Sequence, residues 1–414
     1  MRKIAFSLLV LCLSACASSR SPYAAVQDPT VRAGLDFAEQ QLRVLLSETE
    51  AMIDTVAIGQ KTRVEPRTLK ADGSLSLVAP RDWTSGFFPG TMWYLYEMSG
   101  EEFWKEKAMK FTGYLEPVKS YKGTHDLGFM MYCSFGNGER LAHVPGYRDI
   151  LLEAARSLSS RFNPKVGCIR SWDHGKKWQY PVIIDNMMNL ELLFWASKAS
   201  GDPSFREIAV SHANTTLANH FRPDNSSFHV VDYDVAGDGR PIQFMTHQGY
   251  ADDSAWSRGQ AWGLYGYTMC YRETKDPKYL EQAEKIAAFI LNHPNLPADG
   301  VFYWDFNAPG IPDAPRDVSA AAIAASALYE LSTMSAARGG TYRAAADKII
   351  ASIAAKYCNQ PGQAHGFLTH SSVGSLPGKF EISVPLNYAD YYFIEALVRK
   401  ERLTRGEAVV PAVL

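Results

Sequence analysis

The carboxylate with the most unusual setting in this sequence is Asp185, in the segment YPVIIDNMMNLELLFWAS at residues 180–197. It follows two isoleucines and precedes a long apolar run, and an ionised carboxylate is costly to bury unless another group pairs with it. Asp is also a favoured helix N-cap, and a run of helical period follows it. The segment alone is consistent with a helix cap or with a buried acid that transfers protons.

Other residues that could act on a ligand stand near the starts of further low-charge segments. They are Asp126 in THDLGFMMY, His229 in SSFHVVDYD, Gln248, Asp252, Asp253 and Arg258 in HQGYADDSAWSRGQAW, and Trp83, Trp172, Trp256 and Trp262. Two carboxylates, an arginine and several tryptophans around one cavity would suit a sugar. Tryptophan faces stack on pyranose rings, and arginine can bind an anionic group through two parallel hydrogen bonds.

Each of these residues also has a purely structural interpretation. Asp126 could cap a helix, and the tryptophans could pack in the core. His125 and His229 could be hydrogen-bonded core histidines, and Arg258 could pair with one of the two aspartates before it. A sugar site is therefore expected only if the fold brings these residues to one cavity.

Composition and missing motifs exclude several classes of function. We find no G-x-x-x-x-G-K-[ST], H-E-x-x-H or G-x-S-x-G motif, and no G-x-G-x-x-G after a strand. The ten histidines lack metal-ligand spacing, so we expect no metal site and no cofactor. The 42 basic and 44 acidic residues give a net charge of −2 without a long basic run, which gives no reason to expect nucleic-acid binding.

The candidate residues belong to a recurring pair of predicted helices. Six segments carry few charges, as helices buried on all sides do, and they span 83–100, 125–138, 184–201, 253–273, 317–332 and 383–400. Five amphipathic segments with a charged face begin at residues 100, 146, 202, 276 and 341. This alternation predicts stacked helical hairpins.

Six hairpins closed around one axis form an all-α (α/α)6 barrel, which is the fold we predict. WTSG at 83–86 is echoed by WSRG at 256–259, which supports an internal repeat. The alternative is an open α-solenoid, which normally has a more regular repeat. No Pro/Gly/Ser-rich linker divides the chain, so we predict a single catalytic domain over residues 16–414.

The N-terminus has the layout of a secretory leader. Two basic residues precede the apolar stretch 4–15, which is too short to cross a bilayer, and LSAC at 13–16 resembles a bacterial lipobox. We expect residues 1–15 to be a signal peptide and Cys16 to carry a lipid that anchors a periplasmic protein to a membrane. The alternative is a plain cleavage site with an incidental cysteine. Cys133, Cys168, Cys270 and Cys358 are too widely spaced to indicate a zinc site or a disulfide framework.

Five long motifs occur in one order along the chain: WTSGFFPGTMWYLYE, THDLGFMMYCSFGNG, IIDNMMNLELLFWAS, DDSAWSRGQAWGLYGY and RDVSAAAIAASALYEL. Together they resemble the unsaturated glucuronyl hydrolases of glycoside hydrolase family 88, from about Trp83 to Ala396. The resemblance implies an (α/α)6 barrel. It also implies removal of a 4,5-unsaturated glucuronyl residue from the non-reducing end of oligosaccharides that polysaccharide lyases leave from glycosaminoglycans.

Matched motif by motif, the resemblance assigns the family's catalytic acid and base to Asp185 and its second essential carboxylate to Asp126. Its substrate-binding positions fall on His125, His229, Gln248, Arg258 and Trp262, with Trp83 and Trp172 as stacking partners. The implied substrates are chondroitin, heparan or hyaluronan fragments. HSSVGSLPGKFEIS, at 370–383, resembles a region that contacts the neighbouring sugar in relatives, so a sulfate there could touch Ser372, Ser375 and Lys379.

The chemistry implied by this resemblance explains how one acid can suffice. Protonation of C4 of the vinyl ether creates an oxocarbenium-like cation at C5, to which water adds. Asp185 must then stay protonated near neutral pH, which its apolar surroundings and a neighbouring Asp126 carboxylate favour. Three alternatives remain: an unsaturated rhamnogalacturonyl hydrolase, an inverting glycosidase with separate acid and base, and a non-catalytic sugar-binding lipoprotein.

Overall fold

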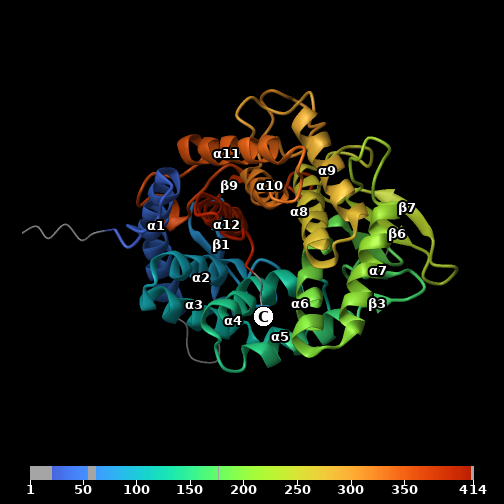
Figure 1. Cartoon of the computed structure of the whole chain (residues 1–414), viewed down its shortest axis with the longest axis horizontal. Coiled ribbons are helices and arrows are strands. Elements are labelled where there is room, and N and C mark those ends of the chain that lie inside the picture. Colours follow the sequence, from blue (N-terminus) through green and yellow to red (C-terminus); the bar gives the residue numbers. More distant parts are fainter. Residues whose placement is uncertain (1–20, 55–61, 176, 412–414) are drawn as a thin grey trace, which may run out of the picture.

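Alternate helices of the chain form the inner and outer layers of a closed ring (Figure 1). The computed structural model describes residues 21–54, 62–175 and 177–411. The inner layer consists of α2 (Phe87–Ser99), η2 (Gly128–Gly136) with α4 (Asn137–Ala142), η3 (Ile184–Asn189) with α6 (Leu190–Ser200), α8 (Ser257–Thr274), α10 (Val318–Leu331) and α12 (Asn387–Thr404). The outer layer consists of α1 (Pro29–Asp54), α3 (Glu102–Tyr114), α5 (Tyr147–Ser159), α7 (Pro203–Asn219), α9 (Pro277–Asn292) and α11 (Gly339–Lys356).

The ring is closed by contact between the last and the first inner helices. Each inner element packs against the next one along the chain, and α12 packs against α2. The (α/α)6 barrel is therefore confirmed, and the open solenoid is excluded. The five amphipathic segments predicted from the sequence correspond to five of the outer helices. The sixth outer helix is α1, which precedes the first low-charge segment and was not part of the predicted alternation.

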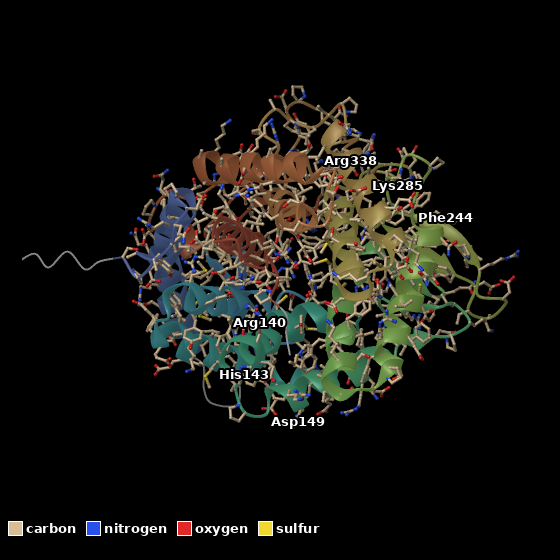
Figure 2. All side chains as sticks on the ribbon, viewed as in Figure 1. Arg140, His143, Asp149, Phe244, Lys285 and Arg338 are labelled. Atoms are coloured by element: carbon tan, nitrogen blue, oxygen red, sulfur yellow. The ribbon has the colours of Figure 1, made fainter. Side chains whose placement is uncertain are left out.

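Burial explains which helices lie inside. Every residue of α10, VSAAAIAASALYEL, is buried, because small and apolar side chains allow neighbours on all sides. In α9 the buried residues recur at helical spacing, at Tyr279, Ala283 and Ile286, whereas Lys285 is exposed. Figure 2 shows Lys285 and Arg338 projecting from the periphery of the ring.

The two ends of the barrel differ in the length of their connections. Inner helices pass to outer ones through short turns; Gly100 and Gly201 end α2 and α6 with φ values of 71° and 76°, which glycine adopts without strain. Outer helices return to inner ones through the long connections 160–183, 220–256, 293–317 and 357–386. The long connections and the starts of the inner helices therefore share one end of the barrel.

Short antiparallel strands organise these long connections. β1 (Glu65–Leu69) pairs with β2 (Leu75–Val78), β3 (Phe162–Asn163) with β4 (Cys168–Ile169), and β8 (Ser372–Ser375) with β9 (Phe380–Val384). β5 (Pro181–Ile183), β6 (Val230–Tyr233) and β7 (Pro241–Met245) form one sheet. Two 3-10 turns lie elsewhere in the chain, η1 (Glu116–Ser120) after α3 and η4 (Ala364–Gly366) between α11 and β8. The pairing of Ile183 with Val230 places Asp185 near His229.

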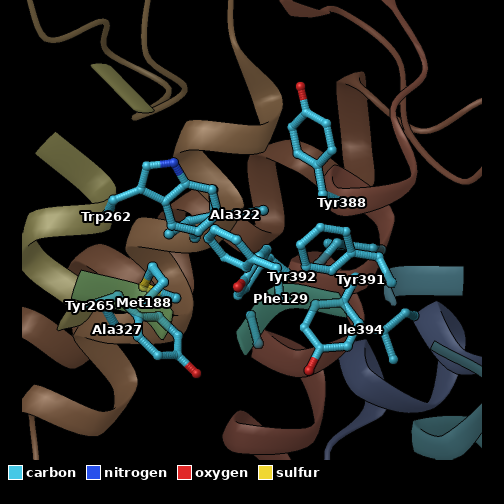
Figure 3. Packing of buried hydrophobic residues seen from close by; sticks show 14 of the residues in the cluster. Phe129, Met188, Trp262, Tyr265, Ala322, Ala327, Tyr388, Tyr391, Tyr392 and Ile394 are labelled. Carbon is cyan, nitrogen blue, oxygen red and sulfur yellow. The ribbon is translucent and has the colours of Figure 1, made fainter. Parts of the chain in front are cut away.

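Aromatic side chains fill the barrel axis below the long connections (Figure 3). Trp262 is fully buried, with its ring centroid 5.0 Å from that of Phe129 and 5.4 Å from that of Tyr392. Offset and edge contacts of this kind favour one fixed arrangement of the rings. The barrel interior at this depth is a packed core.

The predicted signal peptide and the lipid site at Cys16 lie outside the described residues. Across the part of the chain that is described, no helix combines the length and the apolar character needed to cross a membrane. Cys133, Cys168, Cys270 and Cys358 are free thiols.

Candidate active site

A pocket of about 280 Å³ opens at the end of the barrel where the inner helices begin, close to the lower end of the range of about 300–1,000 Å³ for small-molecule sites. Of the predicted residues, it is lined by Trp83, His125, Asp126, Trp172, Asp185, Gln248 and Arg258. The long connections supply most of this wall. The fold thus brings together both carboxylates and two of the tryptophans.

Asp185 lies in the first turn of η3 and caps no helix. No side chain caps η3 or α6 at its N-terminus, and Asp185 Oδ2 is buried without a hydrogen-bond partner. Burial raises the pKa of Asp185 to about 7; the charge of Asp126 also raises it, while His125 and Arg258 oppose the shift. The helix-cap interpretation is wrong, and the side chain is an acid that still carries its proton near neutral pH.

Asp126 is held as a carboxylate by its neighbours. Its Oδ1 lies 3.1 Å from His125 Nε2, and its Oδ2 accepts a hydrogen bond of 2.6 Å from the Thr124 hydroxyl. Burial alone would raise the pKa of Asp126, but His125, Thr124 and Arg161 outweigh burial and lower it below the usual value. The pocket therefore contains one protonated and one ionised carboxyl group.

The tautomer of His229 is determined by the backbone. Its Nδ1 accepts hydrogen bonds of 3.1 Å from the amides of His247 and Gln248, so its proton must lie on Nε2. Burial, together with the charges of His247 and Arg258, lowers the pKa of His229 well below its usual value, so the ring is neutral. Nε2 lies 3.6 Å from Asp185 Oδ2. His229 therefore faces Asp185 from a distance longer than a hydrogen bond, and it is not one of the residues that line the pocket.

Arg258 is engaged by the protein itself. Its Nη1 lies 2.8 Å from Asp317 Oδ2 and also donates to the carbonyl of Val373, and its Nη2 donates to the carbonyl of Gly374. The predicted structural ion pair exists, but with Asp317 in place of an aspartate just before Arg258. These bonds occupy both terminal nitrogens, so Arg258 ties β8 to the start of α8 as well as lining the pocket.

Gln248 reinforces the same contact with β8. Its Nε2 donates a hydrogen bond of 3.0 Å to the Gly374 carbonyl, the acceptor that Arg258 also uses. Gln248, from the connection between α7 and α8, and Arg258, at the start of α8, thus hold β8 through one backbone oxygen.

Besides His229, four residues predicted to bind substrate do not line the pocket. Trp262 follows Arg258 by one helical turn, which places it about 6 Å deeper along the barrel, in the aromatic core. Ser372 and Ser375 are buried, and their hydroxyls accept backbone hydrogen bonds within the protein. Lys379 is exposed near the tip of the β8–β9 hairpin. The Ser372 hydroxyl is occupied by the Ser319 amide at the start of α10 and the Ser375 hydroxyl by the Gly378 amide within the hairpin, while depth along α8 explains the tryptophan.

The structure adds three lining residues that were not singled out in the sequence, and it shows the contact made by Trp256, which was. Thr124, His174 and His247 line the pocket, and the Trp256 ring stacks on His229 with 4.3 Å between centroids. His174 follows Trp172 by two positions and His247 directly precedes Gln248, so proximity to a predicted residue is the only sequence signal for either.

Comparison with known proteins gives a consistent result, although no family model matches the chain. The unsaturated glucuronyl hydrolase of Formosa agariphila is 50% identical over 331 residues, which cover 79% of this chain and 82% of that protein. An unsaturated chondroitin disaccharide hydrolase of Streptococcus pyogenes serotype M1 is 34% identical, with 81% and 85% covered.

A solved structure described as an unsaturated glucuronyl hydrolase specific for heparin is also similar. It superimposes with a TM-score of 0.83 at 46% identity, covering 91% of this chain and 100% of that one. Three observations point to the same family: the barrel fold, the pocket with its two unlike carboxyl groups, and the extent of sequence identity. The chain belongs to the unsaturated glucuronyl hydrolases, glycoside hydrolase family 88.

Proposed function

We propose that this protein releases the 4,5-unsaturated glucuronyl residue from the non-reducing end of glycosaminoglycan oligosaccharides by hydrating its C4=C5 double bond. The observation that carries the proposal is the contrast between the two carboxyl groups. Asp185 has a pKa of about 7, whereas the pKa of Asp126 lies below its usual value. A general acid is most effective when its pKa is close to the working pH.

In the proposed reaction, Asp185 donates its proton to C4 of the vinyl ether, and positive charge develops at C5. The Asp126 carboxylate stabilises this charge across the pocket. Water then adds to C5 and gives a proton back to Asp185. The resulting C5 hemiketal opens and releases the glycosidic bond without attack at C1, so Asp185 ends each cycle in its starting state.

The inverting glycosidase is a weaker candidate because of the bonds to Asp126. Such an enzyme needs one carboxylate to activate a water beside the anomeric carbon. Both oxygens of Asp126 already contact His125 and Thr124. Asp126 is therefore better suited to hold a negative charge than to deprotonate water.

Isotope labelling distinguishes these two reactions. In heavy water, deuterium should appear at C4 of the released sugar, and oxygen from labelled water should enter at C5, read before the ketone exchanges. A saturated glucuronide should be inert, since it has no double bond to protonate, and the ultraviolet absorbance of the enol should disappear. Cleavage of the saturated glucuronide at a comparable rate, with label at C1, would contradict hydration.

The substrate class is supported by the names of the relatives. One is named for unsaturated chondroitin disaccharides and another is described as specific for heparin. For this chain we propose unsaturated disaccharides from chondroitin, heparan or hyaluronan as substrates.

We also propose that Cys16 carries a lipid that anchors the enzyme to a membrane on its periplasmic side. The support is the sequence LSAC directly after a short apolar stretch. Cells that express the wild-type chain with a labelled fatty acid should yield a labelled enzyme, and Cys16→Ser should yield none. Unlabelled wild-type enzyme would mean that the protein is secreted without a lipid.

A further inference from the structure

Two histidines flank one tryptophan of the pocket, and a lysine lies over the tryptophan next to it. The ring centroids of His174 and His247 lie 5.6 Å and 5.5 Å from that of Trp172, and all three residues line the pocket. The Lys177 ammonium lies 4.4 Å from the centre of the Trp178 ring, which packs against Trp172. We call His174, Lys177 and His247 the basic rim.

Among the described residues, no acidic side chain forms an ion pair with the basic rim, although Arg161, Arg170 and His174 together lower the pKa of the neighbouring Asp173. In the part of the chain that the structure describes, the His174 and His247 side chains form no hydrogen bond, and Lys177 forms no ion pair. Asp173, next to His174, already binds Arg161 and also pairs with Arg170. The basic rim is therefore a group of hydrogen-bond donors without ion pairs, and two of its members line the pocket.

The charges within the basic rim act on one another. Burial and then the charges of Lys177 and His174 lower the pKa of His247 below its usual value. The other charged or titratable groups around the pocket are Asp126, Asp185, His125 and Arg258 on its wall, His229 bonded to the His247 amide, and the Asp173–Arg161–Arg170 cluster. An anion bound at the basic rim would relieve this mutual repulsion.

The position of the basic rim relative to the two carboxyl groups indicates which part of a substrate it would meet. Trp172 forms a backbone bridge with Thr124, whose hydroxyl donates to Asp126. The unsaturated residue must lie against Asp126 and Asp185 for its C4 to be protonated. A second sugar that stacks on Trp172 would meet His174 and His247, which lie beside that ring.

We propose that His174, His247 and Lys177 bind a sulfate group on the sugar that follows the unsaturated residue, and so make the preference for sulfated substrates depend on pH. This inference rests on the function proposed above. Sulfate stays ionised over the working range, whereas an imidazole is charged only when it is protonated. Sulfate binding favours the protonated imidazoles, so the preference for a sulfated disaccharide must grow as the pH falls.

Binding measurements on an inactive enzyme test this inference without turnover. The Asp185→Asn protein is titrated with two unsaturated disaccharides that differ only in a sulfate on the second sugar, at about pH 5.5 and about pH 8. The ratio of the two Kd values should favour the sulfated sugar about fivefold more at the lower pH, as expected for charge pairs near a surface. In the added double variant His174→Gln/His247→Gln, the ratio should not change with pH.

A control variant tests whether the effect belongs to the basic rim, and two results would overturn the inference. His143, labelled in Figure 2, is exposed at the end of α4 and does not line the pocket, so His143→Asn in the same background should keep the pH-dependent ratio. A ratio that is independent of pH in the parent protein overturns the inference. So does an equal loss of affinity for both sugars in the double variant, because the histidines would then only support Trp172. Failure of the proposed function is a separate result, seen when the wild-type enzyme hydrates neither disaccharide.

Discussion

Asp185→Asn should lower kcat/KM by about 10³-fold or more, within the range of about 10²–10⁴ attributed to general acid–base catalysis and with no second acid to take over. The amide has nearly the shape of the carboxyl group but cannot give a proton to C4 or accept one from water. For the wild-type enzyme, protonated Asp185 is the active form, so kcat/KM should fall as the pH rises through about 7. Steady-state rates on an unsaturated disaccharide across this range measure both effects.

Measuring the thermal stability of Asp185→Asn distinguishes a loss of catalysis from a loss of folded structure. The unfolded chain releases the Asp185 proton near its usual pKa of about 3.9, whereas the folded protein keeps it until about pH 7. The folded state binds more protons over this interval, so this group lowers the free energy of unfolding as the pH rises. At pH values above 7 the Asn variant should therefore melt no lower than wild type. Turnover within tenfold of wild type in the folded variant would exclude Asp185 as the proton donor.

Asp317→Ala should cost about 3–5 kcal/mol of folding stability, because it leaves the Arg258 charge buried and unpaired. The two side chains are 1% and 0% exposed, and Asp317 also accepts hydrogen bonds from the amide and hydroxyl of Ser319 at the start of α10. Denaturation by urea, with the slope compared between variants, measures this loss.

An exposed ion pair provides the matched control for Asp317. Arg240 and Asp238 are 3.7 Å apart, with side chains 74% and 66% exposed. Asp238→Ala should therefore change stability by less than about 1 kcal/mol. If Asp317→Ala were no more destabilising than Asp238→Ala, the buried pair would not stabilise the junction of α8, α10 and β8.

The layers of the fold follow from local patterns, whereas the ion pair of Arg258 does not. Charge content distinguishes α10 from α9, because a helix surrounded by others excludes charged side chains. Periodicity also indicates that Arg258 and Trp262 share a face of α8. It does not say that one turn separates pocket from core, or that the partner of Arg258 lies 59 residues further along the chain.

The sequence is similarly limited in identifying which buried aspartate is the catalytic acid. Burial raises the pKa of Asp390 to about 7, as it does for Asp185. Asp390, however, accepts hydrogen bonds from the amides of Leu368 and Thr369 and from the Thr369 hydroxyl, so it is a structural bridge. Apolar neighbours in the sequence indicate a buried carboxyl group. Only the three-dimensional set of donors distinguishes a reactive group from a structural one.

The two amides that bind His229 have a consequence for engineering the specificity of this enzyme. They belong to His247, at the pocket mouth, and to Gln248, which holds β8, while the opposite edge of the same ring faces Asp185. The mouth and the proton donor thus share one rigid support. A library that replaces the side chains at these positions leaves the support intact, whereas a proline at 248 or an inserted residue would remove an amide and shift the acid. Selectivity is therefore best redesigned here through side chains, with the length and path of the backbone kept constant.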